Sequence, residues 1–170
     1  FLVNGDFYSS IDHLEWAVAL KPDFAEAHNN LGSALIGVDK TRDAIISYKK
    51  AALLKPDFAT TFNNLGIAYQ RLGMIELALE NYQIAIDILP GFAQAHHNLS
   101  GVKNYSENDS QINQMKSMLS NNELSSQDRI YLSFALAKAN EDLGNHKELF
   151  KHLHNGNKLR KEELNYSIAK

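Results

Sequence analysis

The run Asn29-Asn30-Leu31-Gly32 returns 34 residues later as Asn63-Asn64-Leu65-Gly66. Working outward from this run, residues 25–58 can be laid over residues 59–92 without a gap, which gives eleven identical positions. Large, small and helix-breaking residues all fall in the same register, so we interpret the match as an internal repeat. The prolines that close each unit keep the same 34-residue interval: Pro22, Pro56 and Pro90.

Each unit has the periodicity of two amphipathic helices. Leu65, Ala68 and Leu72 recur at helical spacing, and a second set follows Gly73, a residue suited to the turn between helices. Glycine inside a helix destabilises it by about 1 kcal/mol relative to alanine, so the repeated interior glycines indicate a close approach of two helices. We expect the small residues of the second helix to meet them: Ala44, Ala51, Ala78 and Ala85.

This pattern of 34 residues resembles the tetratricopeptide repeat family. The resemblance implies an all-α fold, a right-handed superhelix (α–α solenoid) of about nine helices. We predict a repeat array over residues 1–105: the end of one repeat, with its turn at Gly5 and Phe7, two full repeats at 25–58 and 59–92, and the start of a third.

Residues 106–170 are interpreted as a divergent, tetratricopeptide-like helical hairpin that caps the array. We expect a short helix near Asp109–Leu119. Ser125 is predicted to cap a further helix that runs to about Leu143, and a last helix is predicted over His146–Leu164. Gly144 takes the place of the turn glycine between the last two helices.

In this family the first helix of each repeat lines a concave groove. The resemblance therefore predicts columns of groove residues, of which the clearest is Asn30, Asn64 and Asn98. The surrounding run looks like the repeats of O-linked N-acetylglucosamine transferase, whose asparagines form a ladder that holds peptides. An amide can donate to and accept from a peptide backbone of any sequence. The expected peptide-binding residues are Asn29, Asn30, Ser33, Asn63, Asn64, Ile67, His97 and Asn98.

Other interpretations of these asparagines stay open. Their side chains could simply be solvated, or they could bridge adjacent helices. The asparagines at 29, 30, 63 and 64 also stand where related proteins carry the lysine and arginine that clamp an acidic C-terminus. We therefore expect no clamp of that kind.

Composition excludes several other functions. The formal net charge of −3 argues against nucleic-acid binding, and no apolar run approaches the roughly 20 residues that span a bilayer. There is no cysteine, and neither His96 and His97 nor His152 and His154 have the i, i+4 spacing of two metal ligands. We predict no metal, no cofactor and no enzyme activity in these residues. The expected location is the cytoplasm.

Residues 112–169 contain Asp128-Arg129-Ile130, then Phe134-Ala135-Leu136-Ala137-Lys138-Ala139 and Glu141-Asp142-Leu143-Gly144. With these runs the stretch resembles the segment that joins tetratricopeptide repeats to a sulfotransferase domain in bacterial fusion proteins. The chain opens with Phe1 rather than Met, and we interpret it as a fragment of a longer protein, for which a sulfotransferase is the leading expectation. The predicted function is a docking module for a protein or an extended peptide. The alternative is a structural scaffold that associates with itself through exposed repeat ends, without a peptide ligand.

Overall fold

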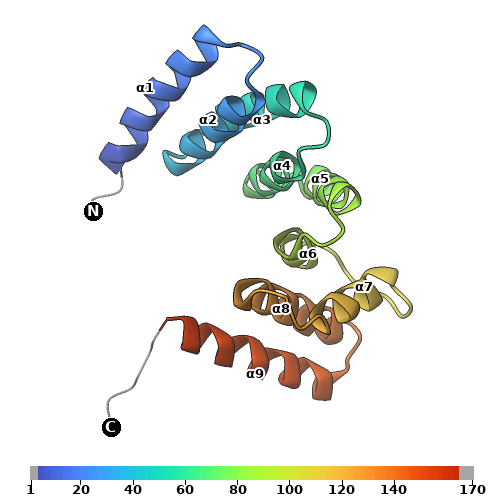
Figure 1. The fold of residues 1–170 in the computed structure, drawn as a ribbon. Helices are drawn as coiled ribbons and strands as arrows, with labels where there is room; N and C mark the ends of the chain where they lie inside the picture. The colour runs from blue at the N-terminus through green and yellow to red at the C-terminus, as the bar shows by residue number, and fades with distance from the viewer. Residues whose placement is uncertain (1–3, 165–170) are drawn as a thin grey trace. The chain divides into compact units, whose positions relative to one another are not determined.

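The computed structural model describes residues 4–164, with side chains from residue 7 onward. Within that part the chain forms nine α-helices and no strand (Figure 1). The fold class is all-α, as predicted. The chain divides into two compact units, residues 1–90 and residues 91–170. The helices of the first unit are α1 (Asn4–Leu20), α2 (Ala25–Gly37), α3 (Thr41–Leu54), α4 (Ala59–Arg71) and α5 (Ile75–Ile88).

In the first unit, each full repeat is a pair of packed helices, α2 with α3 and α4 with α5. The predicted close approach at the interior glycines is present, but an aromatic ring makes it. A methyl group added to Gly32 would lie 2.6 Å from the ring of Tyr48, and one added to Gly66 would lie 2.5 Å from that of Tyr82. Glycine is needed because the tyrosine ring comes directly against the first helix, while the expected alanines of the second helix are fully buried.

The turns inside the two repeats use a positive φ, as predicted for Gly73 (φ 72°). In the preceding repeat Asp39 takes this conformation, with φ 63°. Asp and Asn are the non-glycine residues that tolerate it best. The two turns therefore share a backbone shape although their side chains differ.

The beginning of the chain differs from the sequence prediction. Gly5 and Phe7 were expected at a turn, but both lie within α1, which starts at Asn4. The Phe7 ring lies against Gly37, where an added methyl group would come within 2.7 Å of it. Phe7 is therefore a packing residue of a second helix, in the same role as Tyr48 and Tyr82.

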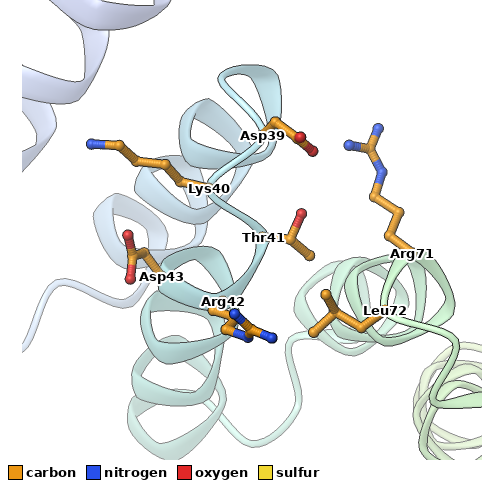
Figure 2. Close-up of a pocket in the computed structure, with 7 residues that line it drawn as sticks. All are labelled: Asp39, Lys40, Thr41, Arg42, Asp43, Arg71 and Leu72. Atoms are coloured by element: carbon orange, nitrogen blue, oxygen red, sulfur yellow. The ribbon is translucent and has the colours of Figure 1, made fainter.

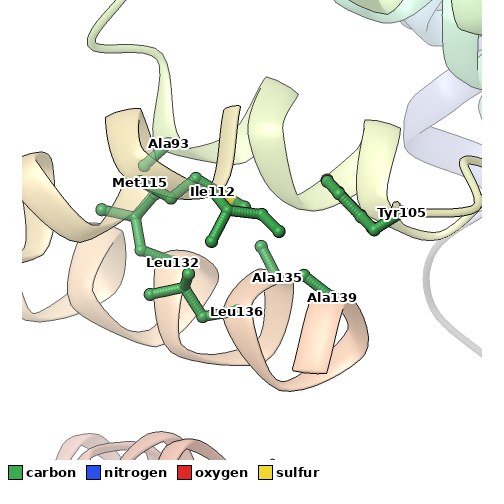
Figure 3. Packing of buried hydrophobic residues seen from close by; sticks show 8 residues of the cluster. All are labelled: Ala93, Tyr105, Ile112, Met115, Leu132, Ala135, Leu136 and Ala139. Atoms are coloured by element: carbon green, nitrogen blue, oxygen red, sulfur yellow. The ribbon is translucent and has the colours of Figure 1, made fainter. Parts of the chain in front are cut away.

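The second unit contains α6 (Ala93–Ser100), α7 (Ser110–Leu119), α8 (Ser126–Asp142) and α9 (His146–Glu163). Its core is one cluster of buried residues from α6, α7, α8 and the α6–α7 loop (Figure 3). The sequence-based division at residue 105 differs from this grouping, because Ala93 and Tyr105 belong to the same cluster as Met115, Leu132 and Leu136. Apolar burial favours keeping such a cluster in one unit.

The cap at Ser125 matches the sequence prediction, since the Ser125 hydroxyl accepts a hydrogen bond of 3.1 Å from the backbone N–H of Asp128. Asp109, which the sequence analysis did not predict as a cap, caps α7 by accepting from the backbone N–H of Gln111. The predicted boundaries of α7, α8 and α9 hold to within one or two residues. The turn between α8 and α9 is at Gly144, with φ 69°.

Candidate peptide-binding surface

The predicted groove residues of the first unit lie on α2 and α4, and Asn29 links the two helices. Its side chain is only 6% exposed. The Asn29 Oδ1 atom accepts two hydrogen bonds of 3.1 Å, one from the Thr61 hydroxyl and one from the Asn64 amide. Asn29 is thus a bridge between adjacent first helices, which was the alternative interpretation of these asparagines.

Burial also removes Asn63 from the accessible surface, since it is 1% exposed. The prediction of direct peptide contacts by the side chains of Asn29 and Asn63 is therefore corrected. The physical reason is their place on the helix: Asn29 is turned toward α4, and both asparagines come one position, about 100° around the helix, before the more exposed Asn30 and Asn64. An amide can serve there because its donor and acceptor groups are satisfied by hydrogen bonds.

Accessible polar groups remain on the same helices. Asn30 is exposed, and its side chain has no hydrogen-bond partner among the described residues. Asn64 is half-buried and is held by its bond to Asn29, while its carbonyl oxygen pairs with no described residue. Ser33 is exposed, and its hydroxyl lies 3.1 Å from that of Tyr48. Half-buried Ile67 adds an apolar contact on α4.

In the second unit, the candidate residues His97 and Asn98 lie half-buried on α6. The His97 ring is 5.5 Å from the ring of Tyr131 and 6.3 Å from that of Phe134, both on α8. Burial, followed by the positive charge of Arg160, lowers the pKa of His97. A neutral imidazole within an aromatic cluster suits contacts with apolar or planar groups of a ligand.

Tyr131 and Phe134 were missed by the sequence analysis. A signal for Phe134 was present, because Gly144 follows it by ten residues just as Gly73 follows Asn63. Alignment through the turn glycine would have put Phe134 in the Asn29–Asn63–His97 column. The insertion before α8 shifts the register from 34 to 37 residues, and for this reason the fixed interval failed there.

No group of three or more His, Cys, Asp or Glu side chains in the described part of the chain could hold a metal ion. His96 is fully buried, and its Nδ1 atom lies 3.1 Å from the Gln111 amide. It is a core residue. Over residues 4–164, no helix has the length and apolar character needed to cross a membrane.

Comparison with known proteins supports the fold. Residues 25–58 match the family model described as tetratricopeptide repeat. No curated protein matches the chain. Among solved structures, MamA is similar, with 23% identity, a TM-score of 0.69, and coverage of 95% of this chain and 93% of that one.

Two further structures are similar at low identity. YrrB, described as a TPR protein with an unusual peptide-binding site, is 14% identical with a TM-score of 0.64, over 94% of this chain and 81% of that one. The O-GlcNAc transferase of Thermobaculum terrenum is 23% identical with a TM-score of 0.58, over 68% of this chain and 23% of that one. The chain therefore has the all-α fold of tetratricopeptide-repeat proteins.

Proposed function

We propose that this chain is an interaction module that binds an extended segment of a partner protein along its first helices. The observation that carries the proposal is the Asn29 network. It holds the amide of Asn64 in one orientation, while the carbonyl oxygen of Asn64 and the whole side chain of Asn30 keep their capacity for hydrogen bonds. Oriented amides at repeat spacing suit a peptide backbone, whose N–H and C=O groups also recur regularly.

The first test is a binding measurement with the triple variant Asn30→Ala, Asn64→Ala and Asn98→Ala. A peptide would be selected from random linear peptides on the wild-type chain, and its affinity measured by fluorescence anisotropy. We expect binding about tenfold weaker in the triple variant, the factor that corresponds to about 1.4 kcal/mol. The control is Asn155→Ala, an exposed asparagine on a second helix.

The outcome is interpretable only if the stack stays folded, which circular dichroism and a thermal melt would establish. Equal affinities for the wild type and a folded triple variant would remove the asparagine ladder from the proposal. If Asn155→Ala weakens peptide binding and the triple variant does not, the binding site lies on the second helices.

For the parent protein we propose the docking arm of a bacterial, cytoplasmic sulfotransferase. The support is the resemblance of residues 112–169 to the segment that precedes such a domain. The groove would then bind the acceptor protein, and this chain would take no part in the chemistry. Sequencing the gene downstream of Lys170 tests this proposal. A strand and a Pro-x-Ser-Gly-Thr-type loop support it, whereas further repeats or a stop codon contradict it.

A specific observation favours self-association as the second candidate function. Trp16 and Leu20 on α1 are 73% and 76% exposed, and they line an open hollow of about 490 Å³. Exposed apolar patches mark contact sites between proteins. Light scattering of the purified chain would distinguish the two functions: a dimer that Trp16→Ala converts to a monomer supports association through α1, and a concentration-independent monomer excludes it.

A further inference from the structure

A second open site lies in the first unit, where the α2–α3 turn meets the last residues of α4. It is a pocket of about 720 Å³ (Figure 2). The pocket is lined mainly by charged residues, unlike the neutral amides of the first-helix surface. Its lining consists of Asp39, Lys40, Thr41, Arg42, Asp43, Arg71 and Leu72.

Thr41 is the residue that sets this pocket apart from an ordinary turn. It is 7% exposed, yet its hydroxyl makes no hydrogen bond to any residue that the structure describes. In Figure 2 the hydroxyl is directed into the space between Asp39 and Arg71. Because the rest of the residue is buried and this hydroxyl faces the open pocket, it is available to donate a hydrogen bond to a ligand or to accept one from it.

The backbone adds further donors at the same place. Thr41, Arg42 and Asp43 form the first turn of α3, where the N–H groups have no partner within the helix. Lys40 precedes them without a side-chain cap. The α3 helix has 14 residues, so its amino-terminal end carries the partial positive charge of a helix dipole.

The five charged side chains around the turn do not pair with one another. None of the five makes an ion pair within residues 7–164, and Arg71 makes only a long bond of 3.4 Å to the Ile36 carbonyl. Figure 2 shows Lys40 and Asp43 extending to the opposite side of the turn. Arg42 and Arg71 therefore share the pocket with one carboxylate, that of Asp39, which leaves an excess of one positive charge on this side.

The repeat itself does not require these residues. In the next repeat, Met74, Ile75 and Glu76 stand 34 residues after Lys40, Thr41 and Arg42. That turn has the same backbone form with neither the hydroxyl nor the cations. The pocket is thus a feature of one repeat and not of the fold.

From the Thr41 hydroxyl that faces the pocket, the helix end and the two arginines together, we propose that this pocket binds a phosphate group. Phosphate oxygens accept simultaneously from hydroxyl, backbone N–H and guanidinium donors, and arginine pairs with them in a bidentate manner. The group would come either as free phosphate or as a phosphoserine side chain of a protein. This inference is independent of the peptide-binding proposal, since the two share no residue.

The test uses the ¹⁵N-labelled chain, titrated with inorganic phosphate at constant ionic strength. We expect saturable NMR shifts that are largest at the backbone amides of Thr41, Arg42 and Asp43. Thr41→Val should weaken binding about tenfold, as for the loss of one charge-assisted hydrogen bond of about 1.4 kcal/mol. Thr41→Ser should bind like the wild type, and it guards against a folding defect in the valine variant.

Variants that change the charge of the pocket test whether its arginines and Asp39 affect phosphate binding. Arg42→Gln and Arg71→Gln should each weaken binding, whereas Lys50→Gln, with the same charge change at an exposed site on α3, should not. Asp39→Asn should strengthen binding, because it removes the one carboxylate facing the anion and asparagine tolerates the positive φ. Shifts that do not saturate, or that survive in Thr41→Val and both arginine variants, overturn the proposal.

Parallel titrations with O-phosphoserine and with serine separate the two sources of phosphate. Tighter binding of phosphoserine than of inorganic phosphate supports a phosphorylated protein as the ligand. Equal binding supports free phosphate. Binding of serine as tight as that of phosphoserine would show that the phosphate is not recognised, and would overturn the proposal.

Discussion

The Nδ2 atom of Asn64 donates a hydrogen bond of 3.1 Å to the Oδ1 atom of Asn29, and so joins the first helices of two consecutive repeats. The same Asn29 oxygen accepts from Thr61, whose side chain is fully buried. One amide therefore satisfies two donors and fixes the register of α4 on α2. The residues expected to bind a ligand are, in part, the residues that hold the repeats together.

Asn29→Ala should lower the free energy of unfolding by about 1–3 kcal/mol, because it leaves the buried Thr61 hydroxyl and the Asn64 amide without their acceptor. Urea unfolding followed by circular dichroism measures this change. Asn30→Ala is the matched control at the adjacent exposed position, with an expected change within about 0.5 kcal/mol. Equal effects at the two positions would contradict a bridging role for Asn29.

Gly66→Ala should destabilise the chain by about 1–3 kcal/mol, since the new methyl group would lie 2.5 Å from the Tyr82 ring. The steric penalty outweighs the gain in helix propensity of about 1 kcal/mol. Thermal unfolding measures the effect. Combining it with Tyr82→Leu should give a loss smaller than the sum of the two single losses, because the clash is then relieved.

Gly91→Ala provides the control for that series. An added methyl group at Gly91 meets no atom within 4 Å, and its φ is not positive. We expect a neutral or slightly stabilising effect, since alanine restricts the unfolded chain. A loss at Gly91 as large as that at Gly66 would show that glycine matters for chain flexibility and not for the tyrosine contact.

Except for the turn expected at Gly5 and Phe7, the sequence was sufficient to predict the helices, the turns and a close approach at the interior glycines, since each depends on a local pattern repeated in register. It was insufficient to predict which of Asn29 and Asn30 is buried, because the two residues are adjacent and identical in type. A rotation of about 100° along the helix buries the first and exposes the second. Which side faces the neighbouring helix depends on how the repeats pack, and an exact 34-residue period carries no information about that.

The aromatic cluster of the second unit shows a different limit. His97 follows the 34-residue period, but its partners Tyr131 and Phe134 do not, because α7 is inserted between α6 and α8. The pocket proposed to bind phosphate lay equally beyond sequence reasoning. No sequence motif marks the turn around Thr41, and only the structure shows its hydroxyl directed into a pocket.

The pKa of His97 leads to a prediction about pH. Burial and the positive charge of Arg160 lower this pKa in the folded state, so the unfolded chain binds the proton more readily. The contribution of His97 to stability is therefore complete above the ordinary histidine pKa of about 6.5 and is lost as pH falls below it. The pKa of His152 is also lowered, mainly by burial, so His152 adds a further loss of stability as pH falls.

His97→Phe should accordingly reduce the loss of stability between about pH 7 and pH 5, on either side of the ordinary histidine pKa. Phenylalanine fits beside Tyr131 and Phe134 and removes the buried Nδ1 atom that has no hydrogen-bond partner. Urea unfolding at the two pH values measures the difference. His154→Gln, at an exposed position on α9, serves as the control. An unchanged pH dependence in His97→Phe would assign the loss to other groups.

Arg129 organises the loop between α7 and α8 through its guanidinium group. It donates to the backbone carbonyls of Leu119 and Leu124 at 3.2 Å and of Asn121 at 2.6 Å. Lysine keeps the positive charge, but one ammonium group cannot reproduce three donors fixed in a plane. Arg129→Lys should therefore lower the free energy of unfolding by about 1–2 kcal/mol, the value of one or two lost hydrogen bonds.

Hydrogen exchange gives the readout that distinguishes this role from a general loss of stability. Amides of the α7–α8 loop should exchange faster in Arg129→Lys, while those in the interior of α8 change only through the global stability. Ser125→Ala, which removes the α8 cap at a similar loss of about 1 kcal/mol, is the comparison variant. If Arg129→Lys exchanges uniformly faster throughout the unit, the guanidinium contributes to packing and not to the fixing of the loop.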